Sequence, residues 1–206
     1  MRKKELSTIV ASIAAKMQEQ CQYLVELDAR NGDGDLGLSM RDCWGAVSEF
    51  IRTTEMEDLG RILMQCSKEA NKAAPSTLGT IMSFWMMGAA KALRGKTDVS
   101  ISDFADALMA GIDLISANAG SNVGDKTVLD AIVPAVEALK AHAEEGAAAA
   151  TNAAFLAAED GMERTKEMVS RHGRAAYYGE QGRGLVDGGA VAGKLIFEAT
   201  AQCFQA

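Results

Sequence analysis

Apolar residues recur every three or four positions along most of this chain, which is the spacing that lines one face of an α-helix. Runs of alternating β-branched and aromatic residues, which would indicate strands, are missing, and only two prolines, Pro75 and Pro134, occur. Alanine, leucine, methionine and glutamate are abundant, and all four favour helices. The pattern therefore predicts an all-α protein.

The same spacing predicts eight helical segments. The first is a single amphipathic helix whose apolar stripe runs from Leu6 to Val25. The segment from Ile81 to Gly88 is apolar on nearly every side, so we expect it to be a buried central helix. The eight stripes lie in residues 6–25, 40–51, 59–66, 81–88, 104–115, 129–139, 147–168 and 189–197.

Four residues are expected to shape helix ends or interrupt a helix. Asp35 is placed to cap the second helix, and Ser102 and Asp103 are placed to cap the fifth. Pro134 lies inside the sixth helix, where it should cause a kink and free one carbonyl group.

The composition limits the possible partners. The chain has 206 residues and a net charge of −7, which disfavours binding to nucleic acid or to anionic membranes. Its length suits a single domain over residues 1–206. No apolar run is long enough to span a membrane, and the start of the chain lacks an apolar signal core. The 4 cysteines are far apart without metal-binding spacing, so we expect a cytoplasmic protein with reduced cysteines.

The stretch from Asp28 to Gly37 carries the clearest chemical signal. It holds the carboxylates of Asp28, Asp33 and Asp35 together with three glycines. Carboxylate oxygens are hard ligands, and three of them repel one another unless a cation lies between them. We therefore expect a divalent metal ion here, with a phosphate held at the N-terminus of the helix that follows.

Three other interpretations of this stretch remain open. Gly32, Gly34 and Gly37 match the spacing of a dinucleotide-binding fingerprint, but that motif follows a strand rather than a helix. An EF-hand loop starting at Asn31 would place Leu36 where glycine is required. The stretch could also be a solvated acidic turn.

Four breaks between the predicted helices are rich in Gly, Ser, Thr or Asp, and each precedes a helix. In an antiparallel up-and-down bundle, alternate loops lie at the same end. All four breaks are therefore expected at one end of the bundle, where together they would form a binding site. They are residues 28–37, 75–77, 124–127 and 186–189.

The motifs in and near these breaks resemble, in the same order, those of the nucleotide-binding L subunit of dihydroxyacetone kinase. The similar residues are Asp28 with Gly32-Asp33-Gly34-Asp35, then Gly124-Asp125-Lys126-Thr127, and then Gly173-Arg174-Ala175 followed by Asp187. The resemblance extends from about Leu24 to the last helix. It implies an eight-helix antiparallel up-and-down barrel that holds ADP or ATP at one end through two Mg²⁺ ions.

The resemblance also implies roles for individual residues. Asp28, Asp33 and Asp35 would be the Mg²⁺ ligands, and Arg174 would stabilise charge on the transferred phosphoryl group. The activity would be phosphoryl transfer to dihydroxyacetone or a similar triose or tetrose, held by a separate K subunit. The phosphoryl donor would be ATP or a phosphotransferase-system protein. The residues expected to contact the nucleotide are Gly37, Leu38, Ser39, Ser76, Thr77, Val128, Arg174, Asp187 and Gly188.

The chain departs from the family pattern in three places. Leu36 replaces a polar residue, often histidine, after the third aspartate. Residues 73–80 differ from the usual Gly-x-Ser-Gly-Pro run, so Ser76 and Thr77 are assigned by position and chemistry. Gly188 stands where a proline commonly follows the aspartate. These departures bear on the phosphate contacts and the substrate but leave the metal ligands intact.

Some residues admit a second interpretation. Asp125 and Lys126 could form an ion pair that caps a helix. His142 and His172 are expected on the surface, which leaves no convincing nucleophile or general base in the chain. A competing hypothesis is a non-catalytic helical module that binds a divalent metal or serves regulation. Such a module would need the acidic stretch but would not need Arg174.

Overall fold

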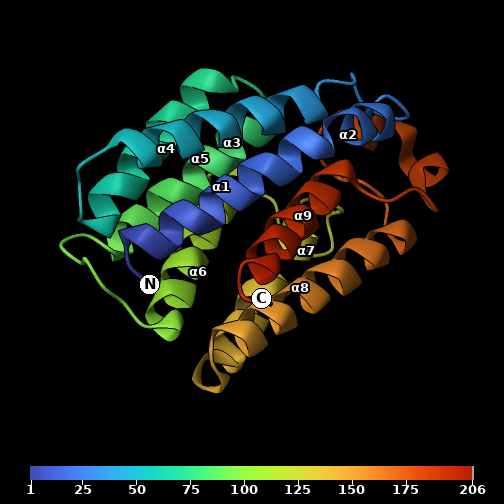
Figure 1. The fold of residues 1–206 in the computed structure, drawn as a ribbon. Helices are drawn as coiled ribbons and strands as arrows, with labels where there is room; N and C mark the ends of the chain where they lie inside the picture. The colour runs from blue at the N-terminus through green and yellow to red at the C-terminus, as the bar shows by residue number, and fades with distance from the viewer. Residues whose placement is uncertain (206) are drawn as a thin grey trace.

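The computed structural model describes residues 1–205, which fold into helices joined by short loops (Figure 1). These residues contain no β-strand beyond one isolated bridge between Arg2 and Asp98. The predicted all-α class is therefore confirmed. The α-helices are α1 (Lys3–Glu19), α2 (Cys21–Asp28), α3 (Leu36–Thr53), α4 (Leu59–Ala73), α5 (Thr77–Ala92), α6 (Ile101–Ala119), α7 (Leu129–Ala141), α8 (Ala147–Arg164) and α9 (Gly188–Gln202). The 3₁₀ segments are η1 (Ala143–Glu145), η2 (Thr165–Glu167) and η3 (Arg174–Gly182).

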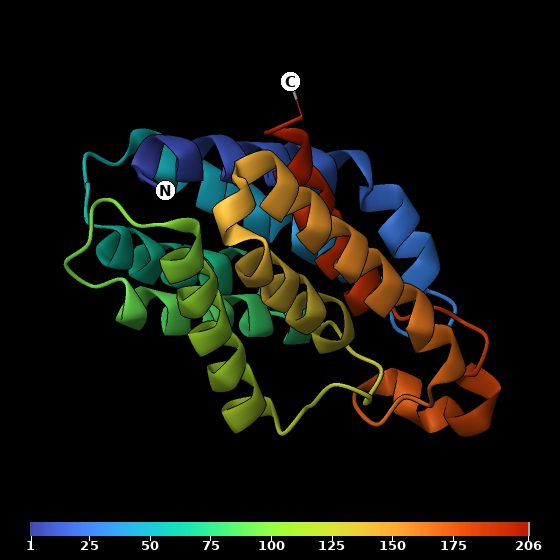
Figure 2. The ribbon, with the colours of Figure 1, turned by 90° about the horizontal axis from the view of Figure 1, so that it is seen from below.

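Eight of these helices form a closed ring. From α3 to α9 each helix packs against the next, and α1 packs against both α3 and α9. Successive helices of the ring run in opposite directions, which Figures 1 and 2 show from two sides. The eight-helix antiparallel barrel is thus confirmed. Helix α2 extends α1 beyond the ring and packs on α3.

The prediction of one first helix is wrong, because the segment is two helices. The chain breaks at Gln20, whose φ and ψ are −90° and 4°. Beside the break, the carbonyl oxygen of Cys21 would lie 2.0 Å from a Cβ atom on Gly37, so α2 and α3 approach closely there. The apolar stripe continues through the break, since Leu24 and Leu27 are buried. The sequence spacing therefore gave no sign of it.

Two other helix ends differ from the prediction. Helix α6 is capped by Ser100 rather than by Ser102, and the hydroxyl of Ser100 accepts a hydrogen bond from the Asp103 N–H at 3.0 Å. The cap lies earlier because Asp103 is the third helical residue, from which its carboxylate reaches back to the Ser100 N–H. Helix α8 ends at Arg164 and does not reach Met168.

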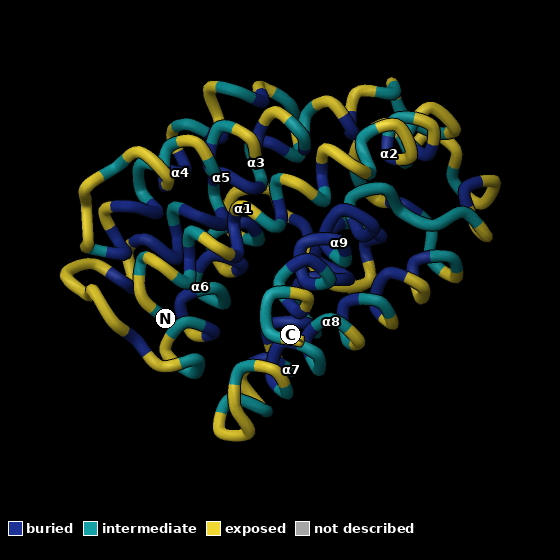
Figure 3. The backbone as a smooth tube through the Cα atoms, viewed as in Figure 1, coloured by how far each residue is buried: buried dark blue, intermediate teal, exposed yellow. Residues whose placement is uncertain are grey.

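The buried positions of the helices face the interior of the barrel (Figure 3). They form a continuous apolar cluster that includes both tryptophans, as expected. The cluster surrounds a cavity of about 120 Å³, whose lining includes Trp44, Trp85, Phe104 and Phe197. The core is therefore the inside of a ring of helices.

Helix α5 is a wall of this ring rather than a central helix. It packs between α4 and α6. Met82 and Trp85 on its inner face are buried, whereas Ile81 and Phe84 are only half-buried. Residues 81–88 are apolar on nearly every side, which predicted a buried central helix. That prediction is wrong, because a barrel of eight helices has no helix at its centre.

Pro134 lies inside α7, as predicted. A proline has no N–H for the carbonyl four residues earlier, which here belongs to Asp130. That carbonyl oxygen faces α8 so closely that a Cβ atom on Gly161 would lie 2.0 Å from it. The freed carbonyl is thus covered by the neighbouring helix, while the predicted kink stays a prediction.

The 4 cysteines of the chain are all free thiols. Cys43 and Cys66 are buried, and burial raises the pKa of each thiol to about 12. Cys21 and Cys203 are half-buried. No helix in residues 1–205 is both long enough and apolar enough to cross a membrane.

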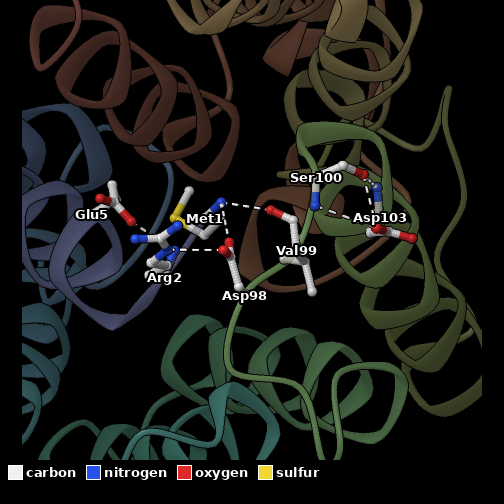
Figure 4. A network of polar contacts seen from close by, with 7 residues as sticks. All are labelled: Met1, Arg2, Glu5, Asp98, Val99, Ser100 and Asp103. Carbon is white, nitrogen blue, oxygen red and sulfur yellow. Dashed lines mark hydrogen bonds and ion pairs between the residues drawn. The ribbon is translucent and has the colours of Figure 1, made fainter.

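The start of α1 is tied to the segment that precedes α6 (Figure 4). The Met1 nitrogen donates to the carbonyl of Val99 at 2.6 Å, and the Val99 N–H donates to the carbonyl of Met1 at 3.1 Å. Arg2 Nε lies 2.8 Å from Asp98 Oδ2. These contacts close the barrel at the end opposite the acidic stretch, which lies at the far end of α1 and α2 (Figure 2).

Candidate nucleotide and metal site

The three aspartates of the acidic stretch lie together. One carboxylate oxygen from each of Asp28, Asp33 and Asp35 lies within 4.8 Å of the others. Asp28 organises the loop, because its Oδ2 accepts hydrogen bonds from the N–H groups of Gly34 at 2.8 Å and Asp35 at 3.2 Å. A Cβ atom on Gly32 would lie 2.1 Å from Asp28 Oδ1, so the loop has no room for a side chain there.

The electrostatics of this cluster favour a cation. Partial burial, followed by the nearby carboxylates of Asp33 and Asp28, raises the pKa of Asp35, while Arg174 lowers it. Arg174 Nη2 lies 3.0 Å from Asp33 Oδ2, and both side chains are substantially exposed. One guanidinium group therefore faces three carboxylates. The donor set is made only of carboxylate oxygens, and Asp33 and Asp35 are exposed, so the cluster fits a hard divalent cation such as Mg²⁺.

Helix α3 begins directly after this cluster with unoccupied N–H groups. Asp35 is its N-cap residue, as predicted, but the Asp35 side chain accepts no capping hydrogen bond. The first helical bond joins the Ser39 N–H to the Asp35 carbonyl at 2.9 Å. The N–H groups of Leu36, Gly37 and Leu38 therefore have no acceptor within the helix. Such a helix start is suited to bind an anion.

Ser76 and Thr77 lie at the start of α5. Ser76 is the N-cap residue, and its hydroxyl accepts a hydrogen bond from the Gly79 N–H at 3.1 Å. Its backbone bonds also stay within this turn, with the Ser76 carbonyl accepting from Thr80 at 2.9 Å. The turn is well formed, and its contact with a nucleotide stays a prediction.

The loop before α7 is held by Asp130, which the sequence analysis did not single out. The buried carboxylate of Asp130 accepts hydrogen bonds from the N–H groups of Gly124 at 2.6 Å and Thr127 at 2.7 Å. Val128, at the end of this loop, is buried, and its nitrogen would lie 3.3 Å from a Cβ atom on Gly189. The signal for Asp130 was present, because Thr127 and Asp130 have the spacing of a capping box.

Asp125 and Lys126 do not pair with each other, so the ion-pair interpretation is wrong. The Asp125 carboxylate accepts from the Asn122 N–H at 2.8 Å and lies 3.2 Å from His172 Nε2 and 3.4 Å from Arg171 Nε. The hydrogen bond from Asn122, with help from His172 and Arg171, lowers the pKa of Asp125. His172 is thus a partner of this loop and not simply a surface residue.

Asp187 caps the start of α9. Its Oδ1 accepts from the Ala190 N–H at 2.7 Å, and its own N–H donates to Thr165 Oγ1 at 3.0 Å. Burial raises the pKa of Asp187 to about 7, although the bond from Ala190 opposes this shift. A Cβ atom on the next residue, Gly188, would lie 2.7 Å from Leu36 Cδ2. The starts of α9 and α3 are therefore in contact.

The predicted site residues thus gather mostly at one end of the barrel. The turn after α2, the loop before α7 and the segment from α8 to α9 lie side by side there in Figures 1 and 2. Three contacts join these elements: Arg174 with Asp33, Leu36 with Gly188, and Val128 with Gly189. The sequence pointed to residues on both sides of each contact but did not predict the pairs.

Comparison with known proteins agrees with this geometry. The family described as DAK2 domain matches residues 30–202. The chain is 30% identical over 173 residues to the ADP-binding subunit DhaL of the PEP-dependent dihydroxyacetone kinase of Escherichia coli, covering 83% of this chain and 82% of that subunit. It is 29% identical to the L-erythrulose 1-kinase of Mycolicibacterium smegmatis, covering 95% of this chain but 35% of that enzyme.

The fold has a counterpart among solved structures. The dihydroxyacetone kinase of C. freundii in complex with AMP-PNP and Mg²⁺ matches with a TM-score of 0.76 and 25% identity, over 96% of this chain and 33% of that chain. The present chain therefore corresponds to about a third of the longer kinases and to most of the separate DhaL subunit.

Together the barrel, the acidic loop and these matches show that the chain belongs to the DAK2 domain family. The predicted resemblance to the L subunit of dihydroxyacetone kinase is confirmed. The relatives are kinases, that is, phosphotransferases with an alcohol group as acceptor, so the predicted enzyme class is also confirmed.

Proposed function

We propose that the chain, acting as one domain over residues 1–206, is the Mg²⁺-dependent ADP- or ATP-binding subunit of a dihydroxyacetone-type kinase. The observation that carries this proposal is the ion pair of Arg174 with Asp33, with 3.0 Å between Nη2 and Oδ2. It brings a phosphate-binding cation to a cluster of three carboxylates. A purely structural metal site, as in the competing regulatory hypothesis, would have no need of this arginine.

The metal ligands in this proposal are Asp28, Asp33 and Asp35, which would hold two Mg²⁺ ions. When bound, the ions would neutralise charge on the phosphates of the nucleotide. The residues themselves set the position of that charge, since Asp28 fixes the loop through the N–H groups of Gly34 and Asp35. A bound cation would also offset the burial and the mutual repulsion that together raise the pKa of Asp35.

The phosphates would lie at the start of α3. The N–H groups of Gly37 and Leu38 have no acceptor within the helix, and Ser39, which carries a hydroxyl, is the next residue. These groups, together with the positive end of the helix dipole, would bind phosphate oxygens. Ser76 and Thr77 at the start of α5 would add further donors.

The remaining predicted residues would position the nucleotide and the transferred group. Val128, Asp187 and Gly188 lie where the starts of α7 and α9 meet, and they would line the nucleotide pocket. The side chain of Arg174 is 68% exposed, so its guanidinium can leave Asp33 for the phosphoryl group at low cost. There it would stabilise the charge that develops during transfer.

The phosphoryl acceptor would be a hydroxyl group of dihydroxyacetone or a similar triose or tetrose, held by a separate K subunit. The donor would be ATP or a phosphotransferase-system protein, and the E. coli relative is named PEP-dependent. ADP that stays bound through gel filtration would indicate a phosphotransferase-system donor, whereas free exchange would indicate ATP. The proposal entails a cytoplasmic location and no nucleic-acid or membrane partner.

Thermal unfolding tests the proposal. A ligand at about 100 times its Kd stabilises a protein by about 2.7 kcal/mol, so MgADP should raise the melting temperature clearly and Ca²⁺ alone should not. If Ca²⁺ alone raised it and MgADP added nothing, the regulatory module would be the correct function. The chain mixed with MgATP and dihydroxyacetone, without a K subunit, should show no robust turnover.

A further inference from the structure

Lys126 is a buried lysine with an unusual backbone. Lys126 is only 2% exposed. Within residues 1–205 it is the one residue other than glycine whose backbone is left-handed, with a φ of 62°. Both features cost free energy, since an ammonium group loses its hydration on burial and a side chain with a Cβ atom disfavours positive φ. A lysine in this position therefore needs contacts that compensate for these costs.

The ammonium group of Lys126 makes two such contacts, and they lie far apart in the sequence. Its Nζ donates to the carbonyl of Gly182 at 2.7 Å and to the carbonyl of Met168 at 3.2 Å. These two carbonyls lie at the two ends of residues 169–181, which leave the barrel and return to it. Lys126 thus joins both ends of this segment to the loop before α7.

The segment between the two carbonyls carries Arg174. Within residues 169–181, the bonds to the barrel lie near the first end, where Arg171 donates its N–H to the Asp125 carbonyl at 3.1 Å. From Arg174 to Gly182 the chain forms a 3₁₀ segment interrupted at Gly179, whose φ is 50°. Tyr177, in the middle, is 91% exposed. Apart from the bond of Arg171 and its own exposed ion pair with Asp33, the position of Arg174 therefore depends on how the two ends of the segment are fixed.

The charged groups around Lys126 fit this role. Burial lowers the pKa of its ammonium group, the carboxylate of Asp187 raises it, and the guanidinium of Arg183 lowers it. Arg183 itself pairs with Glu180, with Nε 2.8 Å from Oε2, and donates to the Glu167 carbonyl. The ammonium is thus held between two carbonyl oxygens and one nearby carboxylate at the base of the segment.

We propose that Lys126 is a positioning residue, which fixes Arg174 over the acidic loop by joining the carbonyls of Met168 and Gly182. The proposal rests on the proposed function for the role of Arg174 toward phosphate. Lys126 itself lies beneath the segment and acts on the nucleotide through Arg174. The alternative is that Lys126 only stabilises the fold as a whole.

Hydrogen exchange of the protein without nucleotide tests the first step. Lys126→Met removes the ammonium but keeps the length of the side chain, and Lys126→Gly also relieves the left-handed backbone. Both variants should lose protection about tenfold at amides of residues 169–182, while the amides of α4 and α5 stay unchanged. Lys166→Met is the matched control, because Lys166 is a half-buried lysine of the same region that pairs with Glu163.

Three results would overturn the proposal at this step. Protection in residues 169–182 that stays at the wild-type level in both Lys126 variants would show that the ammonium does not hold the segment. Loss of protection throughout the barrel would show a global structural role. Loss in Lys126→Met with recovery in Lys126→Gly would assign the effect to the backbone rather than to the ammonium.

Calorimetric titration with MgADP tests the second step through a double-mutant cycle with Arg174→Gln. In the wild-type background Lys126→Met should weaken binding about tenfold, and in the Arg174→Gln background it should change binding less than about twofold. Equal weakening in both backgrounds would overturn action through Arg174. If the wild type bound no MgADP, the proposed function would fail, and hydrogen exchange alone would decide whether Lys126 holds the segment.

Discussion

Helices α3 and α6 both have an aspartate at or near their first turn, Asp35 and Asp103, and the two aspartates have opposite roles. At α6 the hydroxyl of Ser100 accepts from the Asp103 N–H at 3.0 Å, and Asp103 Oδ2 accepts from the Ser100 N–H at 3.3 Å (Figure 4). At α3 the N-cap residue is Asp35, but its carboxylate caps nothing. It points instead toward the cluster that it forms with Asp28 and Asp33.

The pKa shifts reflect this difference. Hydrogen bonds from Ser100 lower the pKa of Asp103, because they stabilise its charged form. Burial and the neighbouring carboxylates raise the pKa of Asp35, because its charged form is destabilised. The start of α6 satisfies its own groups and serves stability, whereas the start of α3 keeps both its carboxylate and its N–H groups available. The starts of α2, α7 and α8 also lack a side-chain cap, so what distinguishes α3 is the cluster of three carboxylates beside its free N–H groups.

The largest expected effect comes from changing the acidic cluster beside the uncapped start of α3. Asp33→Asn keeps the shape of the side chain but removes a charge from the metal site and the partner of Arg174. We expect MgADP affinity to fall tenfold or more, about 1.4 kcal/mol or above, with fewer metal ions bound. The stability of the protein without nucleotide should change little, because the lost ion pair is exposed and the removed repulsion offsets it. Calorimetry and a chemical denaturation curve measure the two quantities.

Asp103→Asn is the matched control for this change, since it alters the aspartate at the capped end. It should leave MgADP affinity unchanged. An equal loss of affinity in both variants would mean that general charge, and not the cluster at α3, attracts the nucleotide. Unchanged affinity in Asp33→Asn would remove the metal site from this account.

The next largest effect comes from removing the cap at the start of α6. Ser100→Ala should lower the free energy of unfolding by about 1 kcal/mol, the usual cost of losing an N-cap, with no effect on nucleotide binding. Because the pKa of Asp103 is lowered in the folded protein, the part of this stability that comes from its carboxylate is present above the unfolded pKa and is lost as the pH falls through the folded pKa. The difference between the denaturation curves of the variant and the wild type should therefore shrink in acid, leaving the share of the Asp103 N–H bond. A constant difference at every pH would contradict this account.

The smallest effect concerns the contact between the start of α3 and the start of α9. Gly188 is the first residue of α9, a position that suits proline, but a Cβ atom there would lie 2.7 Å from Leu36 Cδ2. Two of the three departures from the family pattern, Leu36 and Gly188, thus occur at residues in contact. Gly188→Pro should cost up to about 1 kcal/mol in the wild type, because Leu36 must move.

In a Leu36→Ala background the same proline should instead stabilise the protein by about 0.4–1 kcal/mol, since it restricts the unfolded chain without a clash. Four denaturation midpoints complete this double-mutant cycle. An equal effect of the proline in both backgrounds would show that Leu36 is not what excludes it.

Much of this molecule was determined by local sequence patterns. The spacing of apolar residues predicted the helices, because each helix must turn one face to the core whichever neighbours it has. The clustering of the three aspartates was predictable because Asp28, Asp33 and Asp35 are close in the chain, and a loop of this length cannot separate them widely. The placing of the helix breaks at one end followed from antiparallel packing alone.

The tertiary structure decided what depends on segments that are distant in the sequence. The break at Gln20 accompanies the close contact of Cys21 with Gly37, and the apolar spacing is the same with or without it. The sequence left open an ion pair of Lys126 with its neighbour Asp125, yet the ammonium group of Lys126 reaches carbonyls 42 and 56 residues away. Periodicity and motif spacing indicate which face of a helix is buried, but not which distant residue packs against it. Such contacts, including the ion pair of Arg174 with Asp33, form only when the ring of helices closes.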